Sequence, residues 1–220
     1  MRTVIAGGHG QIALRLQRQL AERGDSAVGL IRDPSQADDL RAVGGEPAVL
    51  DLESASVEDV AAVLTGADAA VFAAGAGPGS GAARKQTVDY AAAVLLADAA
   101  ERAGVRRFLV VSSMGADARA TGPDPVFTAY LRAKGQADDD IRARPSLDWT
   151  ILRPGALTND PGTGSVTLSP TSTGRGSVPR EDVATVLAAL LSTPATAGLT
   201  LELISGPTAV PDAVRKVAGS

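Results

Sequence analysis

A tyrosine and a lysine four residues apart are the part of this sequence best suited to transfer a proton. They are Tyr130 and Lys134 in the segment "YLRAK", within an Ala/Leu/Arg/Asp-rich stretch that predicts a helix. Residues four apart on a helix lie on one face, one turn from each other. A free tyrosine has a pKa of about 10, and a neighbouring ammonium stabilises the phenolate form. The pair therefore fits a general acid or base, although an ordinary amphipathic helix with both side chains on its surface is the alternative.

Two serines upstream extend this candidate catalytic group. Ser112 and Ser113 stand in "LVVSSMG", at the end of an apolar run that predicts the fifth strand. In open α/β sheets, ligands bind at the carboxyl ends of the strands. We expect Ser113 to hydrogen-bond a substrate oxygen beside Tyr130, and Lys134 to hold the ribose of a nicotinamide cofactor as well. Ser112 is expected on the cofactor side of the same strand end.

A glycine cluster near the N-terminus predicts where such a cofactor binds. The segment "VIAGGHGQIALRL" (residues 4–16) places three glycines between an apolar run and the start of a predicted helix. It reads as Gly8-x-Gly10-x-x-Ala13 or as Gly7-x-x-Gly10-x-x-Ala13, two forms of the dinucleotide-binding loop. Bare backbone at a helix N-terminus would hold a pyrophosphate, and a plain tight turn is the alternative. The residues expected at the cofactor here are Gly7, Gly10, Gln11 and Ile12, with His9 facing solvent near the phosphates.

The end of the second predicted strand bears on which dinucleotide binds. "AVGLI" leads into Arg32 and Asp33. An arginine there can pair with the 2′-phosphate of NADP, whereas an acidic residue accepts hydrogen bonds from the ribose of NAD. We therefore expect NADP, with NAD as the alternative in which Asp33 binds the ribose. Asp51, after "PAVL", is expected at the adenine amino group with Leu52 beside the ring; helix capping by Asp51 is an equally simple reading.

Short apolar runs alternate with helix-length segments along most of the chain. Runs such as "RTVIAG", "DAAVFAAG" and "RRFLVVSS" are continuously apolar, which is typical of parallel strands covered on both faces. The alternation predicts an α/β fold with a doubly wound parallel sheet of Rossmann type. Residues 1–220 are expected to form a single domain, to which residues 156–220 contribute a small C-terminal substrate cap. The Thr/Ser/Gly-rich stretch 156–178 predicts either a disordered insert or a binding loop with short strands.

The amino-acid composition limits which kinds of binding partner and metal site we expect. The 220 residues carry a net charge of −4 and have a pI near 5.0, which does not favour nucleic acid or an anionic membrane. The absence of cysteine and the single histidine exclude thiolate metal sites and disulfides and disfavour a histidine-built metal centre. No apolar run reaches the length of a membrane span. We therefore expect a cytoplasmic protein with a small-molecule substrate and no metal; a homodimer is left open.

Eight segments, in one order along nearly the whole chain, carry a family resemblance: "GGHGQIA", "IRDP", "LDL", "VFAAG", "RFLVVSSMGAD", "YLRAK", "LDWTILRPG" and "VPREDVA". They resemble atypical members of the short-chain dehydrogenase/reductase superfamily, close to the NAD(P)-binding proteins of the NAD-dependent epimerase/dehydratase-like type. The resemblance implies that Ala74 and Gly75 lie near the adenosine half of the cofactor. It also implies that the nicotinamide is flanked by Pro154, Gly155, Ala156 and Leu157.

Two departures limit what the resemblance implies about the reaction. Many relatives carry an asparagine where this chain has Ala73, Ala74 and Gly75, and sugar-nucleotide epimerases have a larger C-terminal part. The leading hypothesis is an NADP(H)-dependent oxidoreductase that acts on a small carbonyl or alcohol. The alternatives are an epimerase or dehydratase that reduces and restores its cofactor in each turnover, and a non-catalytic NADP(H)-sensing regulator.

Overall fold

A nine-stranded, mostly parallel sheet forms the centre of the protein. A computed structural model describes residues 1–77 and 79–219; residues 78 and 220 lie outside this description. The strand order is β11-β8-β10-β6-β5-β4-β1-β2-β3, and the chain reverses direction across the sheet after β3, as in a doubly wound fold. The predicted Rossmann-type α/β architecture is therefore confirmed. The strands of this sheet are β1 (Arg2–Ala6), β2 (Ser26–Ile31), β3 (Glu46–Val49), β4 (Ala69–Phe72), β5 (Arg107–Val111), β6 (Asp148–Pro154), β8 (Ser165–Ser169), β10 (Leu199–Ser205) and β11 (Thr208–Ala209).

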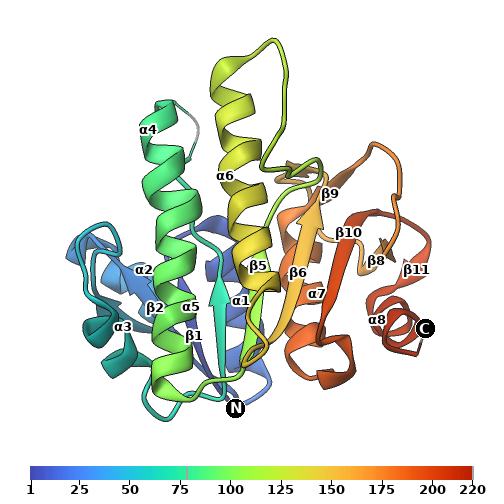
Figure 1. Ribbon diagram of the computed structural model, residues 1–220. Coiled ribbons are helices and arrows are strands. Elements are labelled where there is room, and N and C mark those ends of the chain that lie inside the picture. Colours follow the sequence, from blue (N-terminus) through green and yellow to red (C-terminus); the bar gives the residue numbers. More distant parts are fainter. Residues whose placement is uncertain (78, 220) are drawn as a thin grey trace.

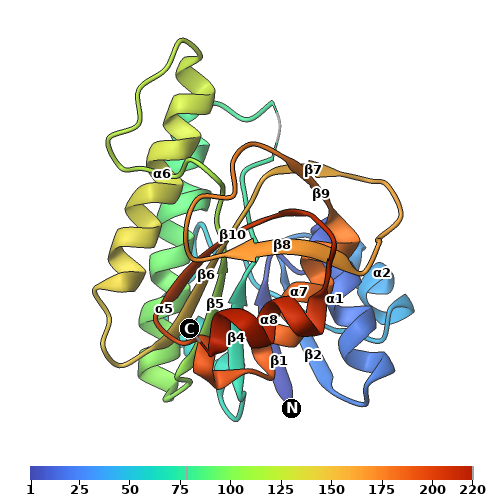
Figure 2. The same ribbon diagram turned by 90° about the vertical axis from the view of Figure 1, so that its right-hand side faces the viewer.

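Helices cover both faces of the sheet (Figures 1 and 2). On one face α7 packs against both α1 and α8, and on the other face α5 contacts both α3 and α6. Each face has its own apolar core, and strands β4 and β5 are buried along their whole length between the two. The helices are α1 (Gln11–Glu22), α2 (Ala37–Ala42), α3 (Val57–Leu64), α4 (Ala82–Arg84), α5 (Ala92–Ala103), α6 (Pro125–Arg142), α7 (Arg180–Leu191) and α8 (Val210–Ala218), with 3-10 turns at Pro34–Gln36 and Pro194–Thr196.

Strand pairing sets which residues reach the ligand-binding edge. β1 pairs in parallel with both β2 and β4, so that Val4 lies opposite Val28 on one side and Ala70 on the other. The parallel series continues through β5, β6 and β10. The loops after β1, β2, β4, β5 and β6 therefore all emerge at the same edge, which is where open α/β sheets bind ligands.

The C-terminal segment extends the main sheet and adds a small one. β8 and β11 continue the sheet in the antiparallel direction beyond β10. β7 (Ala156–Thr158) and β9 (Ser177–Pro179) form a separate two-stranded parallel sheet. A Cβ atom on Gly155 would lie 2.3 Å from the Gly176 carbonyl oxygen, so this crossing requires bare backbone. The stretch 156–178 is thus an ordered loop with short strands, the second of the two sequence expectations.

One long helix carries an irregular turn. α4 and α5 are joined without a break by a π-helical segment, Lys85–Ala91. A π-helical turn widens a helix locally and occurs often at functional sites. Among the described residues, none of the helices combines the length and apolarity needed to cross a membrane.

Candidate cofactor and active site

A cavity of about 330 Å³ opens at the carboxyl ends of β1 to β4. It lies where strand order reverses between β1 and β4, the position at which doubly wound sheets bind ligands. The structure brings together there seven of the residues that the sequence singled out for the cofactor: Gly7, Gly10, Arg32, Asp51, Leu52, Ala74 and Gly75.

The glycine loop forms a cradle without side chains. Gly7 has φ +78°, and a Cβ atom on it would lie 2.6 Å from the Cα atom of Ala74. Gly10 begins α1 as its N-cap, with its amide 2.8 Å from the Gly7 carbonyl oxygen. Gly8 instead packs on β2, where its Cβ would lie 2.6 Å from the Cα atom of Gly29. Of the two loop readings, Gly7-x-x-Gly10 therefore lines the cavity, and this bare backbone at a helix N-terminus fits a pyrophosphate.

The residues around this cradle differ in how they can contribute. Gln11 is exposed at the first turn of α1, whereas the Ile12 side chain is buried in the core. His9 is half-buried on the cavity wall, and its Nε2 atom is 2.8 Å from an Asp39 carboxylate oxygen on α2. Ile12 can therefore meet a ligand in the cavity only through its backbone.

Charged side chains gather at the end of the cavity formed by the segments after β2 and β3. Glu53 accepts hydrogen bonds from Arg84 and Thr87, each at 2.7 Å, and lies 3.6 Å from an Arg32 guanidinium nitrogen. The hydrogen bond from Arg84 is the main reason that the pKa of Glu53 is lowered. Asp51 is engaged locally, because its carboxylate accepts the Glu53 backbone N–H at 3.0 Å. Sequence reasoning missed Glu53 and Arg84, since only the fold brings the segment after β4 to the segment after β3.

Lys134, on the candidate catalytic helix α6, contacts the wall of this cavity through the Ala74 carbonyl oxygen. Its ammonium is buried and donates to the Val111 carbonyl oxygen at 3.1 Å and to the Ala74 carbonyl oxygen at 3.3 Å. These carbonyls end β5 and follow β4, and Ala74 lines the cavity. The side chain of Lys134 therefore reaches from α6 to the carboxyl ends of β4 and β5.

A buried carboxylate holds Lys134 from the other side. Asp89 is fully buried on the π-helical segment, and its Oδ1 atom is 3.4 Å from the Lys134 ammonium nitrogen. Its second oxygen accepts the Ala76 backbone N–H at 3.2 Å. A charged pair with so little solvent must be mutually compensated. Sequence reasoning missed Asp89, although an aspartate within the apolar run "TVDYAAAVLL" was a signal for it.

Tyr130 lies half-buried one turn before Lys134, among other partners. Its ring stacks on Phe127 with centroids 5.9 Å apart, and the Lys85 ammonium lies 5.5 Å from its centroid. Lys85 donates to the Gly77 carbonyl oxygen at 2.9 Å. The cation beside the tyrosine ring is thus Lys85, while the Lys134 ammonium is turned toward the strand ends.

The two serines have different surroundings. Ser113 is half-buried and its hydroxyl donates only to the neighbouring Met114 carbonyl oxygen, at 3.2 Å. Ser112 is buried, and its hydroxyl donates to Asp138 at 2.9 Å. Burial raises the pKa of Asp138, and the Arg153 guanidinium at 2.7 Å opposes that rise. The Ser112 side chain is therefore held within a buried polar cluster with Asp138 and Arg153.

The segment expected at the nicotinamide lies across the ends of three strands. The Pro154 carbonyl oxygen accepts from the Met114 amide at 3.0 Å, and the Gly155 amide donates to Leu203 at 2.9 Å. Ala156 is exposed and Leu157 is half-buried in β7. None of the residues from Pro154 to Leu157 lines the cavity at β1 to β4 as the described residues define it, and neither do Ser112, Ser113, Tyr130 and Lys134.

Comparison with known proteins identifies the family. A family model described as NAD(P)H-binding matches residues 7–194, which is most of the chain. The chain belongs to the NAD(P)H-binding family.

Relatives of this NAD(P)H-binding protein match it over its full length. A Bacillus subtilis protein named as an uncharacterized sugar epimerase is 34% identical over 218 residues, covering 99% of this chain and 100% of its own. A solved structure from Bacillus halodurans, whose name proposes an NAD-dependent epimerase/dehydratase, has a TM-score of 0.90 at 36% identity and covers 98% of this chain and 99% of its own. The oxidoreductase ylbE from Lactococcus lactis has a TM-score of 0.86 at 26% identity, with 100% and 98% covered. The family of this chain therefore binds a nicotinamide cofactor.

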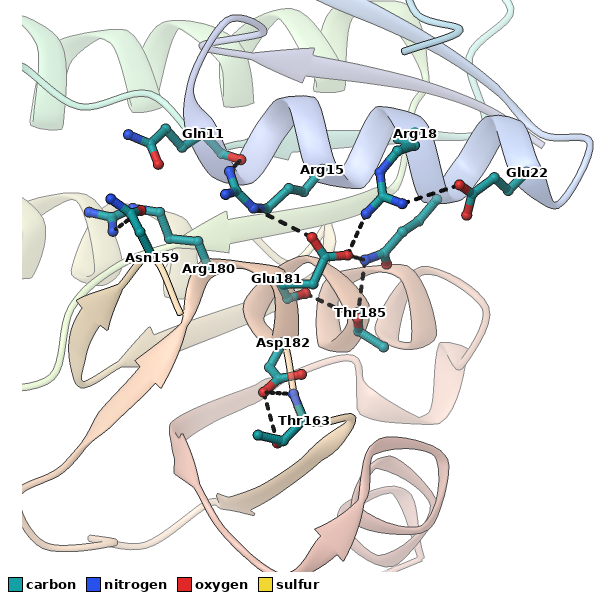
Figure 3. A network of polar contacts seen from close by, with 11 residues as sticks. Gln11, Arg15, Arg18, Glu22, Asn159, Thr163, Arg180, Glu181, Asp182 and Thr185 are labelled. Carbon is teal, nitrogen blue, oxygen red and sulfur yellow. Dashed lines mark hydrogen bonds and ion pairs between the residues drawn. The ribbon is translucent and has the colours of Figure 1, made fainter. Parts of the chain in front are cut away.

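A polar network connects the C-terminal segment of this NAD(P)H-binding protein to α1. Figure 3 shows Glu181, at the start of α7, facing Arg15 and Arg18 on α1. Arg18 donates to Glu181 at 2.6 Å, while Arg15 is 3.4 Å away. The buried Asp182 accepts the backbone N–H groups of Thr163 at 3.0 Å and of Gly164 at 2.8 Å. The first turn of α7 thus connects the loop after β7 to α1, the helix that begins at the glycine cradle.

Proposed function

We propose that this protein is an NADP(H)-dependent oxidoreductase that acts on a small carbonyl or alcohol. The observation that carries the proposal is the contact between Lys134 and the Ala74 carbonyl oxygen, at 3.3 Å. It joins α6, which carries the proposed proton-transfer residue Tyr130, to the wall of the cavity at the ends of β1 to β4. Membership of the NAD(P)H-binding family and the similarity to a bacterial oxidoreductase support the same reading.

The preference for NADP rests on charge at the adenosine end. Arg32 lies on the cavity wall directly after β2, with a side chain that is 57% exposed. A guanidinium presents a planar set of donors that matches a phosphate and stays charged at every physiological pH. We propose that Arg32 faces the 2′-phosphate, while Asp51 and Leu52 face the adenine and Ala74 and Gly75 lie beside the adenosine.

The proposed chemistry involves the cofactor and three side chains, one of which a fourth side chain positions. Bound nicotinamide supplies or accepts a hydride at its C4 atom. Tyr130 would give or take the proton at the substrate oxygen, and Ser113 would donate a hydrogen bond to that oxygen. Lys134 would hold the nicotinamide ribose, positioned by its buried contact with Asp89. Pro154 to Leu157 would flank the ring, and the loop 156–178 would shape the substrate pocket.

An epimerase is the second candidate. It is supported by the name of the Bacillus subtilis relative, which is 34% identical over nearly the whole chain. In that reaction the cofactor is reduced and restored within one turnover, so no net NADPH is consumed. Product analysis with a retained cofactor distinguishes the two.

A tyrosine substitution tests the proposal. The Tyr130→Phe variant should bind NADPH as the native protein does, and should lose about a hundredfold or more in turnover on a panel of small carbonyls, the size of a general acid–base contribution. Tyr90→Phe, on the π-helical segment beside the core, is the matched control and should turn over normally. Undiminished turnover by Tyr130→Phe would remove Tyr130 from the mechanism. NADPH binding without turnover on carbonyls, alcohols and sugar nucleotides would contradict both enzymatic candidates and favour the sensing regulator.

A further inference from the structure

Three charged side chains from three separate segments meet at the adenosine end of the cavity. Arg32 follows β2, Glu53 follows β3, and Arg84 ends the short helix α4 after β4. Glu53 is the carboxylate that both arginines share: one Arg84 nitrogen is 2.7 Å from its Oε2 atom and one Arg32 nitrogen is 3.6 Å from the same atom. Both guanidinium groups therefore converge on a single oxygen from different sides of the crevice.

Each arginine keeps hydrogen-bond donors that the contact with Glu53 does not use. The side chains of Arg32 and Arg84 are 57% and 40% exposed, and within the described residues Glu53 is the acidic partner of each. A guanidinium has five N–H donors, and each of these two directs one nitrogen toward Glu53. The remaining donors face the cavity or solvent. Glu53 itself is held by Arg84 and by the Thr87 hydroxyl, both at 2.7 Å.

We infer that Arg84 is a second arginine of the 2′-phosphate site and that Glu53 is its internal counter-ion, which tunes the choice between NADPH and NADH. This inference rests on the proposed function. Two guanidinium groups that converge on one carboxylate oxygen form a site for an anion, and a phosphate presents more oxygens and more charge than the carboxylate. Glu53 competes with that phosphate by charge repulsion. The same carboxylate can accept a hydrogen bond from the 2′-hydroxyl of NADH, as acidic residues do in NAD sites.

Two substitutions should move the selectivity in opposite directions. The Arg84→Gln variant should weaken NADPH binding about tenfold, the loss expected for one charge-assisted pair, and should leave the dissociation constant of NADH within about twofold. The Glu53→Gln variant should tighten NADPH about threefold and weaken NADH, because the repulsion and the hydroxyl acceptor are removed together. NADPH binding by Arg84→Gln should also depend less on salt than in the native protein.

The experiment is a fluorescence titration of NADPH and NADH against the full chain and four variants: Arg84→Gln, Glu53→Gln, Arg84→Lys and a matched control. Arg41→Gln on α2 is the matched control, because Arg41 is exposed, pairs with Asp38 and lies off the cavity wall. Thermal melting and the Arg84→Lys variant, which retains the charge and should retain most NADPH affinity, separate phosphate binding from misfolding. An equal loss of NADPH and NADH affinity in Arg84→Gln would overturn the inference, and so would an unchanged NADPH/NADH ratio in Glu53→Gln. If the native protein binds NADH but not NADPH, the inference fails while the dinucleotide site stands; if it binds neither, the proposed function fails with it.

Discussion

The buried pair of Asp89 and Lys134 gives the sharpest stability prediction. Replacing Asp89 by asparagine keeps the shape of the side chain and an oxygen for the Ala76 amide, removes the charge, and puts an NH2 donor where a carboxylate oxygen faces Lys134. Lys134 is 3% exposed, so its ammonium would then face no carboxylate and almost no water. Loss of one partner of a buried ion pair costs about 3–5 kcal/mol. Because the Ala74 and Val111 carbonyls still accept from Lys134, we expect the lower end, about 3 kcal/mol.

A double-mutant cycle isolates the pair. The Lys134→Met variant removes the cation, and the double variant with Asp89→Asn leaves two neutral side chains in contact. Neutral replacements of both partners cost less than removal of one. The free energies of unfolding lost in the two single variants should therefore add up to about 2 kcal/mol more than the loss in the double variant. This difference is well above the deviation from additivity seen between distant sites.

The assay is urea denaturation followed by circular dichroism, with thermal melting as a check. A loss of about 3 kcal/mol corresponds to about 6–12 °C in a domain of this size. The matched control is Asp98→Asn, which breaks a more exposed ion pair with Arg144 and should cost about 1 kcal/mol or less. If the two losses of unfolding free energy are simply additive, Asp89 and Lys134 do not stabilise the fold as an ion pair, and the prediction is wrong.

Three further predictions concern other parts of the fold. Gly7→Ala should abolish detectable NADPH binding in calorimetry while the secondary structure persists, because its left-handed backbone and a Cβ atom 2.6 Å from Ala74 force the loop away from the cradle. Arg107→Met should lower the free energy of unfolding, measured by urea denaturation, by about 3 kcal/mol. The buried Arg107 guanidinium makes four hydrogen bonds. It stays charged at pH 7, although burial lowers its pKa to about 10. Arg84→Gln should raise the NMR titration midpoint of the Glu53 carboxyl toward its ordinary value, because the Arg84 hydrogen bond is the main cause of its lowered pKa; an unmoved midpoint would contradict this assignment.

Much of the fold could be predicted from local sequence patterns, because the structure forms the strands and the loop that these patterns indicate. Continuous apolar runs such as "RFLVV" are strands buried on both faces, and the glycine loop lies between β1 and α1 as expected. The strand β8 is less conspicuous, because "SVTLS" is rich in Ser and Thr. Its burial nevertheless alternates along the strand, so a period of two was present in the sequence.

The parts that sequence reasoning missed depend on contacts between distant segments. The Glu53–Arg84 bond joins residues 31 apart, and the Lys134–Asp89 pair joins the π-helical segment to α6. Neither can be read from spacing along one helix or strand. The four-residue spacing of Tyr130 and Lys134 predicts a shared helix face, but it does not reveal that packing turns the lysine toward the strand ends and brings Lys85 to the tyrosine ring.

We propose that the bare backbone at Gly7 and Gly10, at the start of α1, holds the pyrophosphate of a nicotinamide dinucleotide. Isothermal titration of NADPH and NADH into the native protein, with Gly7→Ala in parallel, tests it most directly. We expect saturable binding of one dinucleotide per chain, and we expect Gly7→Ala to lose it. Absence of heat with both dinucleotides, or undiminished affinity in Gly7→Ala, would contradict it.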